Sequence, residues 1–428
     1  MEKNDRKYAA YMSLLKEELI PALGCTEPIA IALAAAKAKK VLGEAPTHLE
    51  ICCSGNIIKN VKGVTVPNSK GLKGIGVAAV LGCVGGNAAQ ELEVLASVTD
   101  EDIERTVELL KTDFFQCRLK EGVDNLYIQA IATTAEHSAS VTIANKHTHI
   151  AEIIKDGIYL LSASNEPEGN KVIDKSFLTM EGIYDFSLNV NVDLLEDTIG
   201  NQIRLNRAIS DEGLTNNYGA RIGKTLLCHA CDCVSTRAKA AAAAGSDARM
   251  GGCALPVVIN SGSGNQGLTI SLSVMEFAKE LSCSREQLYR ALALANLSAI
   301  HIKQYIGNLS AFCGAVSAAA GAGAGITYLS GGNFNAICRT IVNTLADTGG
   351  IVCDGAKASC AAKIASALDS AILSYRMSMD GITFPSDEGI LQPDIETTLK
   401  SIGHVAKEGM RSTDTEILKI MTGETTFE

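Results

Sequence analysis

The sequence contains no tryptophan, and aromatic residues make up only 4% of its 428 residues. Bulky ring side chains therefore cannot dominate the interior. In their place the sequence has 39 glycines and a visible excess of alanine. Small residues allow backbones to approach closely, so we expect an interior of tightly packed helices.

An excess of positive charge is also lacking. The chain has 38 basic and 48 acidic residues, for a formal net charge of −10. No run of Lys and Arg is dense enough to follow a phosphate backbone. This balance argues against a nucleic-acid partner.

Long runs of Leu, Ile and Phe are missing as well. Two charge-free stretches, Gly251–Met275 and Tyr305–Cys338, exceed the roughly 20 residues that span a bilayer, but they consist largely of Gly, Ala, Ser and Asn. Their transfer to lipid would gain little. The charged start, Met1–Lys7, has no apolar signal core behind it. We expect a cytoplasmic protein with no membrane partner, whose 14 cysteines are reduced.

Two helices are expected at the start of the chain. Apolar residues recur at helical spacing over Tyr8–Ile20, and Pro21 ends this pattern. A second helix is predicted over Glu27–Val41, with Thr26 as its N-cap. Cys25 then lies just outside a helix N-terminus.

The middle of the chain is rich in β-forming segments, interrupted by helices near Gly74–Gly85 and Asp100–Lys111. After the polar stretch Ser162–Asn170 the pattern is helical almost to the end, including Ala238–Ala244. We therefore predict an α+β fold, in which a large Ala/Gly-rich helical domain (1–46 and 171–428) carries an inserted α/β domain (47–170). The expected strands are His48–Cys53, Gly63–Pro67, Phe114–Leu119, Asn125–Thr133, Ser140–Ala144, Thr148–Ile154 and Gly157–Leu161.

The strongest local signal for chemistry is a pair of cysteines, Cys353 and Cys360, on either side of a short polar turn. Thiolates favour iron–sulfur clusters or zinc. Cys313 is a candidate third ligand, because Gly314 and the Ala/Gly run after it allow other backbone to come close. Two packed cysteines at the start of a helix are the alternative.

A second group, Cys228, Cys231 and Cys233, falls in a stretch expected to be one helix, Arg221–Ala244. Helical spacing would scatter these thiols over different faces. We therefore expect them not to form the metal site. Core packing is the expected role of most other cysteines, namely Cys52, Cys53, Cys83, Cys117, Cys283 and Cys338.

Cys25 differs from these, because the positive end of a helix lowers the pKa of a thiol and makes it a better base, nucleophile or ligand. A buried thiol before a helix is the equal alternative. His301 and Lys303 are further acid–base candidates, against the alternative that His301 is a satisfied core residue.

Two polar loops are candidates for substrate binding. The first, residues 261–267, contains Ser261, Ser263, Gly264 and Asn265, and its small residues expose backbone N–H groups that suit a carboxylate or phosphate. It lacks the Lys of a phosphate-binding loop. The second loop contains Ser54 and Asn56.

Several short sequence motifs, taken together, resemble the L-cysteine desulfidase family. They occur in the order found in that family, and the resemblance covers nearly the whole chain. The C-terminal half is more distantly similar to the α domain of the iron–sulfur L-serine dehydratases. The motifs are Gly24-Cys25-Thr26-Glu27-Pro28, Asp247-Ala248-Arg249-Met250, Asn260 to Gly267, His301-Ile302-Lys303, Leu309 to Gly314, and Cys353-Asp354-Gly355-Ala356-Lys357.

This resemblance implies a 4Fe-4S cluster held by three cysteines, with the remaining iron free for substrate. By matching order the ligands are Cys313, Cys353 and Cys360, although the dehydratase motif has a longer gap between its last two cysteines. Cys25 matches a cysteine tied to activity in the desulfidases, as the base or as a displaceable fourth ligand.

The implied reaction is elimination of hydrogen sulfide from L-cysteine to give pyruvate and ammonia, without pyridoxal phosphate. Asn265 and its loop would hold the substrate carboxylate, and Ser54 and Asn56 would close the other side. L-serine dehydration by the same route is the alternative, or a non-catalytic iron–sulfur or small-ligand binding protein. The expected partner is a small amino acid, with a homo-oligomer possible.

Overall fold

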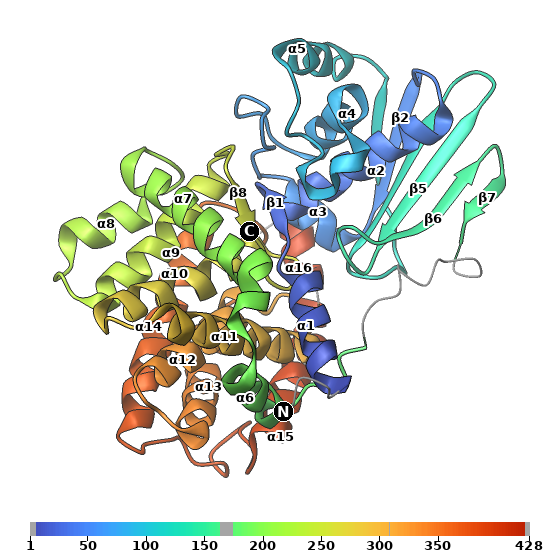
Figure 1. Ribbon diagram of the computed structural model, residues 1–428. Coiled ribbons are helices and arrows are strands. Elements are labelled where there is room, and N and C mark those ends of the chain that lie inside the picture. Colours follow the sequence, from blue (N-terminus) through green and yellow to red (C-terminus); the bar gives the residue numbers. More distant parts are fainter. Residues whose placement is uncertain (1–5, 163–173, 308, 424–428) are drawn as a thin grey trace.

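The computed structural model describes residues 6–162, 174–307 and 309–423. An α/β unit stands beside a larger helical layer, and the first helix, α1 (Arg6–Glu18), packs on that layer (Figure 1). The predicted α+β class with a helical majority is confirmed. Within the described ranges, no helix combines the length and apolarity that crossing a bilayer requires.

The α/β unit is built on a six-stranded sheet in the order β3-β2-β4-β5-β6-β7. β2 and β3 are parallel, and every other neighbouring pair is antiparallel. Residues of β2 and β4 alternate between buried and half-buried, which gives the sheet one core-facing side. The strands are β2 (His48–Cys53), β3 (Phe115–Leu119), β4 (Tyr127–Thr133), β5 (Ser138–Ala144), β6 (Ile150–Lys155) and β7 (Ile158–Leu161).

Helix α2 (Thr26–Leu42) covers this side of the sheet and packs against α4 (Ile75–Gly85). A Cβ added at Gly82 of α4 would lie 2.4 Å from the carbonyl oxygen of Ala32, so only glycine permits this crossing. The unit also contains α3 (Gly55–Val61), η1 (Ala88–Glu93) and α5 (Asp100–Leu109).

Within the helical layer, α12 (Gly314–Leu329) is surrounded by other helices, and its residues 315–327 are all buried. The two charge-free stretches of the sequence thus supply interior helices of the protein. The helices that pack against α12 include α10 (Gly264–Glu280), α11 (Arg285–Ile306), α13 (Phe334–Thr348) and α14 (Cys360–Met379). The remaining elements are α6 (Met180–Asn189), η3 (Val192–Leu195), η4 (Glu196–Gly200), α7 (Asn201–Thr215), α8 (Ile222–His229), α9 (Val234–Met250), α15 (Ile395–His404), η5 (Val405–Gly409) and α16 (Arg411–Thr422).

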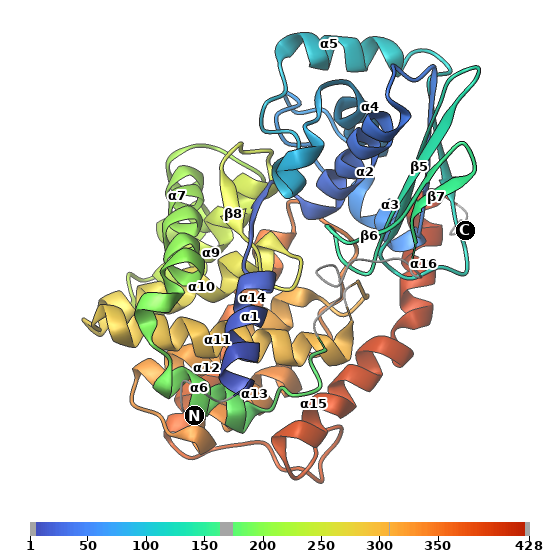
Figure 2. The same ribbon diagram turned by 45° about the vertical axis from the view of Figure 1, so that its right-hand side comes forward.

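Two of the contacts between the α/β unit and the helical layer bring distant parts of the chain together at the boundary. β1 (Pro21–Leu23) pairs antiparallel with β8 (Pro256–Val258). At the other end, α16 leaves the helical layer and packs against α3, as Figure 2 shows. These contacts bring residues from both ends of the sequence to the boundary between the two units.

The structure differs from the sequence-based expectation at three places. Residues 63–67 form a loop with one isolated bridge, Thr65 to Lys73, because the described backbone hydrogen bonds of this segment go to nearby residues, such as Val66 N to Leu72 O, and not to the sheet. α2 packs on the sheet, whereas the expected boundary at residue 46 placed it with the helical domain.

The third difference concerns the stretch expected to be one helix, 221–244. It is interrupted between α8 and α9, where Cys231, Asp232 and Cys233 form the turn. Short polar side chains compete for backbone hydrogen bonds and favour such breaks and caps. Helical spacing therefore does not separate these thiols, and the expectation that it would was wrong.

Candidate functional site: a cavity at four helix N-termini

A cavity of about 100 Å³ lies at the boundary of the two units, and four helices, α2, α10, α12 and α14, begin at its wall. The first N–H groups of a helix lack partners within that helix and carry partial positive charge. Four such ends around one space favour anionic groups, including thiolates and carboxylates.

The three expected cluster ligands all line this cavity. Cys313 is the N-cap of α12, and Cys360 is the first residue of α14. A short antiparallel pairing holds Cys353 beside Cys313: the amide of Cys313 donates to Ile351 O at 3.1 Å, and the amide of Cys353 donates to Ala311 O at 2.6 Å. Residues far apart in the sequence therefore face a common space.

The thiols of Cys313 and Cys353 interact directly. The hydrogen bond that Cys313 donates, aided by the nearby charge of Lys59, lowers the pKa of Cys353 to about 6 despite burial. The same hydrogen bond and burial raise the pKa of the Cys313 thiol. Burial likewise raises the pKa of Cys360, whose sulfur lies 3.8 Å from Gly355 O.

These residues fit an iron–sulfur cluster better than a single metal ion. In the described parts of the chain, no group of three or more His, Cys, Asp or Glu converges closely enough to hold one ion. A four-iron cluster binds each thiolate at a different iron, so its ligands surround a space instead of meeting at a point. The cavity offers four soft sulfur donors in this arrangement: Cys25, Cys313, Cys353 and Cys360.

Cys25 is the N-cap of α2, one position earlier than expected, and its thiol donates to Glu27 Oε2 at 3.1 Å. The expectation that the helix end would lower the pKa of Cys25 was wrong. Burial, with the adjacent Glu27 carboxylate, raises this pKa well above its ordinary value, and the charge of Arg249 does not compensate. Cys25 is therefore a buried thiol that lines the cavity, and its surroundings disfavour the thiolate.

Glu27 and Arg249 place a buried negative and a buried positive group on the cavity wall. Asn60 Nδ2 donates to Glu27 Oε1 at 3.0 Å, and Arg249 Nε donates to Gly24 O at 2.8 Å. Burial raises the pKa of the Glu27 carboxyl, but His147 and Arg249 nearby, together with the thiol, lower it below its ordinary value.

Gly264 is close to this site without lining the cavity. A Cβ at this position would lie 2.3 Å from Arg249 Nε. The glycine at the start of α10 therefore acts by leaving room for the guanidinium. Ser263 and Asn265, on either side of it, do line the cavity as expected.

Lys303, a predicted acid–base residue on α11, also lines the cavity and is only 4% exposed. Burial lowers its pKa to about 8, although Cys353 and Cys313 act in the opposite direction. An amine with such a pKa exists partly as the free base near neutral pH.

His301 is not at the cavity. Two residues before Lys303, it points to another side of α11, where its Nε2 lies 2.8 Å from Glu396 Oε2 and Gln304 Nε2 lies 2.6 Å from its Nδ1. Glu396 also accepts the amide of Met180 at 2.7 Å. Glu396 of α15 therefore links His301 of α11 to the start of α6.

Three expected substrate-binding residues also lie outside the cavity. Ser261 Oγ donates to Asn260 Oδ1 at 2.9 Å. Ser54 is the N-cap of α3 and donates to Asn125 O at 2.6 Å. Asn56 lines a separate cavity of about 480 Å³. Helix α3, which follows Ser54, contributes Asn60 to the cavity wall instead, one helical turn after Asn56.

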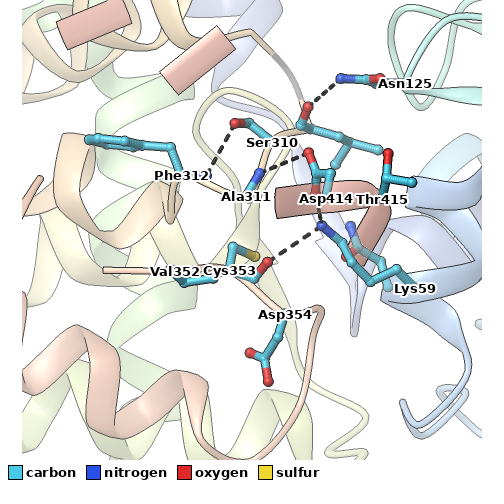
Figure 3. Close-up of polar contacts among 12 residues, drawn as sticks. Lys59, Asn125, Ser310, Ala311, Phe312, Val352, Cys353, Asp354, Asp414 and Thr415 are labelled. Atoms are coloured by element: carbon cyan, nitrogen blue, oxygen red, sulfur yellow. Dashed lines mark hydrogen bonds and ion pairs between the residues drawn. The ribbon is translucent and has the colours of Figure 1, made fainter. Parts of the chain in front are cut away.

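The sequence did not predict the ion pair that holds the cysteine loops. Lys59 forms an ion pair with Asp414 of α16, and the two side chains are 2% and 15% exposed. Lys59 also donates to Cys353 O at 3.4 Å, and Asp414 accepts the amide of Ala311 at 3.0 Å (Figure 3). One ion pair therefore contacts both segments that carry Cys313 and Cys353.

For Arg249, the sequence did contain a signal of its role. Arg249 stands at the end of an Ala-rich helix that is buried throughout its second half, and a charge there needs a specific partner. The pairing of Lys59 with Asp414 has no local signal, because it joins residues from opposite ends of the chain.

Comparisons with known proteins identify the family of this chain. A family model of the serine dehydratase alpha chain matches residues 89–419, a match that begins within the α/β unit. UPF0597 proteins of Lachnoclostridium phytofermentans and Finegoldia magna are 52% and 50% identical, each over 414 residues, and cover 97% and 96% of this chain and 99% of their own. A UPF0597 protein of Desulfitobacterium hafniense is 46% identical over 428 residues, with 99% of both chains covered. The chain belongs to the UPF0597 proteins and to the serine dehydratase alpha chain family.

Proposed function

We propose that this protein is a cytoplasmic, iron–sulfur-dependent L-cysteine desulfidase that releases hydrogen sulfide and yields pyruvate and ammonia. The observation that carries the proposal is one cavity whose wall contains four thiols together with a buried lysine, arginine and glutamate. Elimination from a small amino acid needs these functions together: a site for the leaving group, a base, and charges that hold a zwitterion.

The cavity wall supports binding of a zwitterionic amino acid. Arg249 uses its Nε on Gly24, and its fork offers further donors for a carboxylate, together with the first N–H groups of α10. The ammonium group would meet acceptors on the other side. Glu27 is one, and Asn60 Oδ1 and Asn265 Oδ1 are buried atoms for which the described residues provide no hydrogen-bond partner.

Lys303 is the proposed general base. Its buried amine lines the same cavity as the cysteines, and burial favours its neutral form. The neutral Nζ would take the proton from the α-carbon of L-cysteine as the carbon–sulfur bond breaks and hydrosulfide leaves. The remaining aminoacrylate tautomerises to an imine, which water hydrolyses to pyruvate and ammonia.

Cys313, Cys353 and Cys360 are the proposed ligands of the cluster, and Cys25 the displaceable fourth. When bound, the cluster would supply a Lewis-acidic iron that polarises the side-chain sulfur of the substrate. The thiol of Cys25 already has an acceptor for its proton in Glu27, at 3.1 Å, which supports a ligand role for its sulfur over a base role. No residue in this scheme requires pyridoxal phosphate.

L-serine dehydration is the second candidate, favoured by the match to the serine dehydratase alpha chain. The same residues would act, with hydroxide as the leaving group. Soft iron coordination favours a thiol substrate over a hydroxyl substrate, which is our reason to prefer L-cysteine.

The test is an assay of the anaerobically reconstituted protein. Iron and sulfide content would be measured first, and then release of sulfide and pyruvate from L-cysteine, L-serine and D-cysteine. We expect equal amounts of sulfide and pyruvate from L-cysteine alone. Pyruvate from L-serine at a higher kcat/KM would make the protein a dehydratase, and a full cluster without turnover of either substrate would make it a binding protein.

A further inference from the structure

A second group of thiols lies on the surface, in the turn between α8 and α9. The sulfur atoms of Cys231 and Cys233 are 3.7 Å apart, close enough for contact. Cys231 is exposed and Cys233 half-buried, and neither lines the cavity. The function proposed above does not use this pair.

The turn is held in place on both sides. Asp232 lies between the two cysteines, and its Oδ1 is 2.5 Å from Arg237 Nη1, whose other nitrogen Nη2 is 2.5 Å from Glu280 Oε2 on α10. On the neighbouring turn of α9, Ser235 Oγ accepts from Arg376 of α14 at 2.8 Å. These contacts reduce the freedom of the turn and keep the two sulfur atoms together.

The surroundings of Cys233 favour its thiolate. Cys233 is the N-cap of α9, and its sulfur lies 3.4 Å from Thr236 Oγ1. The Thr236 side chain and the first backbone N–H groups of the helix, together with Cys231, lower the pKa of Cys233 to about 7. A thiolate with a second thiol in contact is the arrangement by which dithiols exchange with disulfides.

We propose that Cys231 and Cys233 form a surface thiol–disulfide exchange site, whose substrates are disulfides of small thiols. The thiolate of Cys233 attacks one sulfur of the substrate, forms a mixed disulfide and releases the first small thiolate. Cys231 loses its proton to water and attacks Cys233 Sγ, which releases the second small thiolate. The protein is oxidised to a Cys231–Cys233 disulfide, and the substrate is reduced to two thiols.

The contact between the two sulfurs gives this site its specific signature. The second attack is intramolecular, so it should outpace attack by any free thiol and leave no adduct on the protein. The lowered pKa of Cys233 contributes less to its reactivity. A larger fraction of this thiol is thiolate at pH 7, but a thiolate of lower pKa is also a weaker nucleophile. The two effects partly cancel, so Cys233 should react about threefold faster than an ordinary thiol at pH 7.

The experiment treats the anaerobic holoprotein with glutathione disulfide at pH 7 and maps the cysteine peptides by mass spectrometry. The peptide with Cys231 and Cys233 should lose two hydrogens and carry no glutathione. In Cys231→Ser the same peptide should retain one glutathione on Cys233. Cys228→Ser is the matched control, because Cys228 is exposed on α8 nearby, and this variant should behave as wild type at the pair.

Two results would overturn the proposal. One is stable glutathione on Cys233 of the wild-type protein, which would mean that Cys231 does not resolve the mixed disulfide. The other is a Cys233→Ser protein whose Cys231 reacts as fast as Cys233 does in Cys231→Ser. Serine is close in size to cysteine and the positions are at the surface, so circular dichroism should report unchanged folding in all three variants.

Discussion

Cys25 and Cys233 occupy the same position in two helices of the same length, since each is the N-cap of a 17-residue helix. The pKa of Cys25 is nevertheless raised well above its ordinary value, whereas that of Cys233 is lowered to about 7. Cys25 is buried and faces the Glu27 carboxylate, whereas Cys233 is near solvent and faces Thr236. A helix end alone contributes roughly 0.3–1 kcal/mol, so burial and the adjacent side chain decide the charge of the thiol.

The largest expected effect tests whether the cysteines of the cavity, and not those of the α8–α9 turn, hold iron. Cys353→Ala should retain little cluster after anaerobic reconstitution and should lose turnover, because one of three fixed ligands is gone. The triple variant Cys228→Ser, Cys231→Ser and Cys233→Ser should keep its iron, sulfide and turnover. Loss of the cluster in the folded triple variant would reverse our assignment.

The next prediction concerns a buried charge. Lys303→Met should bind iron normally and lower kcat by roughly 10²- to 10⁴-fold, as expected for removal of a general base. Absorbance of the reconstituted cluster would be compared with turnover of L-cysteine. A variant with kcat near that of wild type would exclude Lys303 as the base.

The Cys25→Ser variant distinguishes a ligand role of Cys25 from a role in packing alone. The hydroxyl can still donate to Glu27 but lacks the soft sulfur, so we expect an intact fold, most of the iron and loss of most turnover. The electron paramagnetic resonance signal of the reduced cluster should change with the fourth ligand. Wild-type turnover and an unchanged signal would show that Cys25 only fills space.

Ion pairs allow the same contrast between buried and exposed groups. Asp414→Asn leaves Lys59 buried without its counter-charge, and we expect a loss of about 3–5 kcal/mol in stability. Asp100→Asn breaks the Lys70–Asp100 pair, whose side chains are 60% and 73% exposed, and should cost at most about 1 kcal/mol. Denaturant unfolding of both apoproteins would measure the difference, and equal losses would contradict the role given to Asp414.

The smallest expected effect lies at the surface. Thr236→Val removes a hydroxyl 3.4 Å from the sulfur of Cys233, so the pKa of this thiol should rise from about 7. At pH 7 a smaller fraction is then thiolate, and alkylation of Cys233 by iodoacetamide should slow by a few-fold. The difference should disappear above the higher pKa, where both proteins are fully ionised.

The sequence was sufficient for much of the fold and for the cysteines of the site. Periodicity predicted most helices, and the resemblance to the iron–sulfur L-serine dehydratases implied the three cysteines that line the cavity. His301 and Lys303 show the limit of prediction from sequence. Both lie in the same helical segment, but they point to different sides of the helix, and only Lys303 lines the cavity.

The remaining errors also have physical causes. The pKa of Cys25 depends on burial and on the orientation of Glu27, which spacing does not reveal. The break before Cys233 depends on cap preferences over a few residues, which a helical pattern of apolar residues does not detect.

The pairing of β1 with β8 has a consequence for how the protein is made. It joins residues 21–23 to residues 256–258. The residues that line the nearby cavity include Cys25, close to the start of the chain, and Cys360, in its last fifth. Contacts of such sequence separation form late and slowly, because long loops must close before they are stabilised. Cys25 therefore leaves the ribosome long before its cavity exists, and loading of the proposed cluster would have to follow completion of nearly the whole chain. Until then every one of these thiols is open to oxidation, so the chain depends on a reducing environment while it folds.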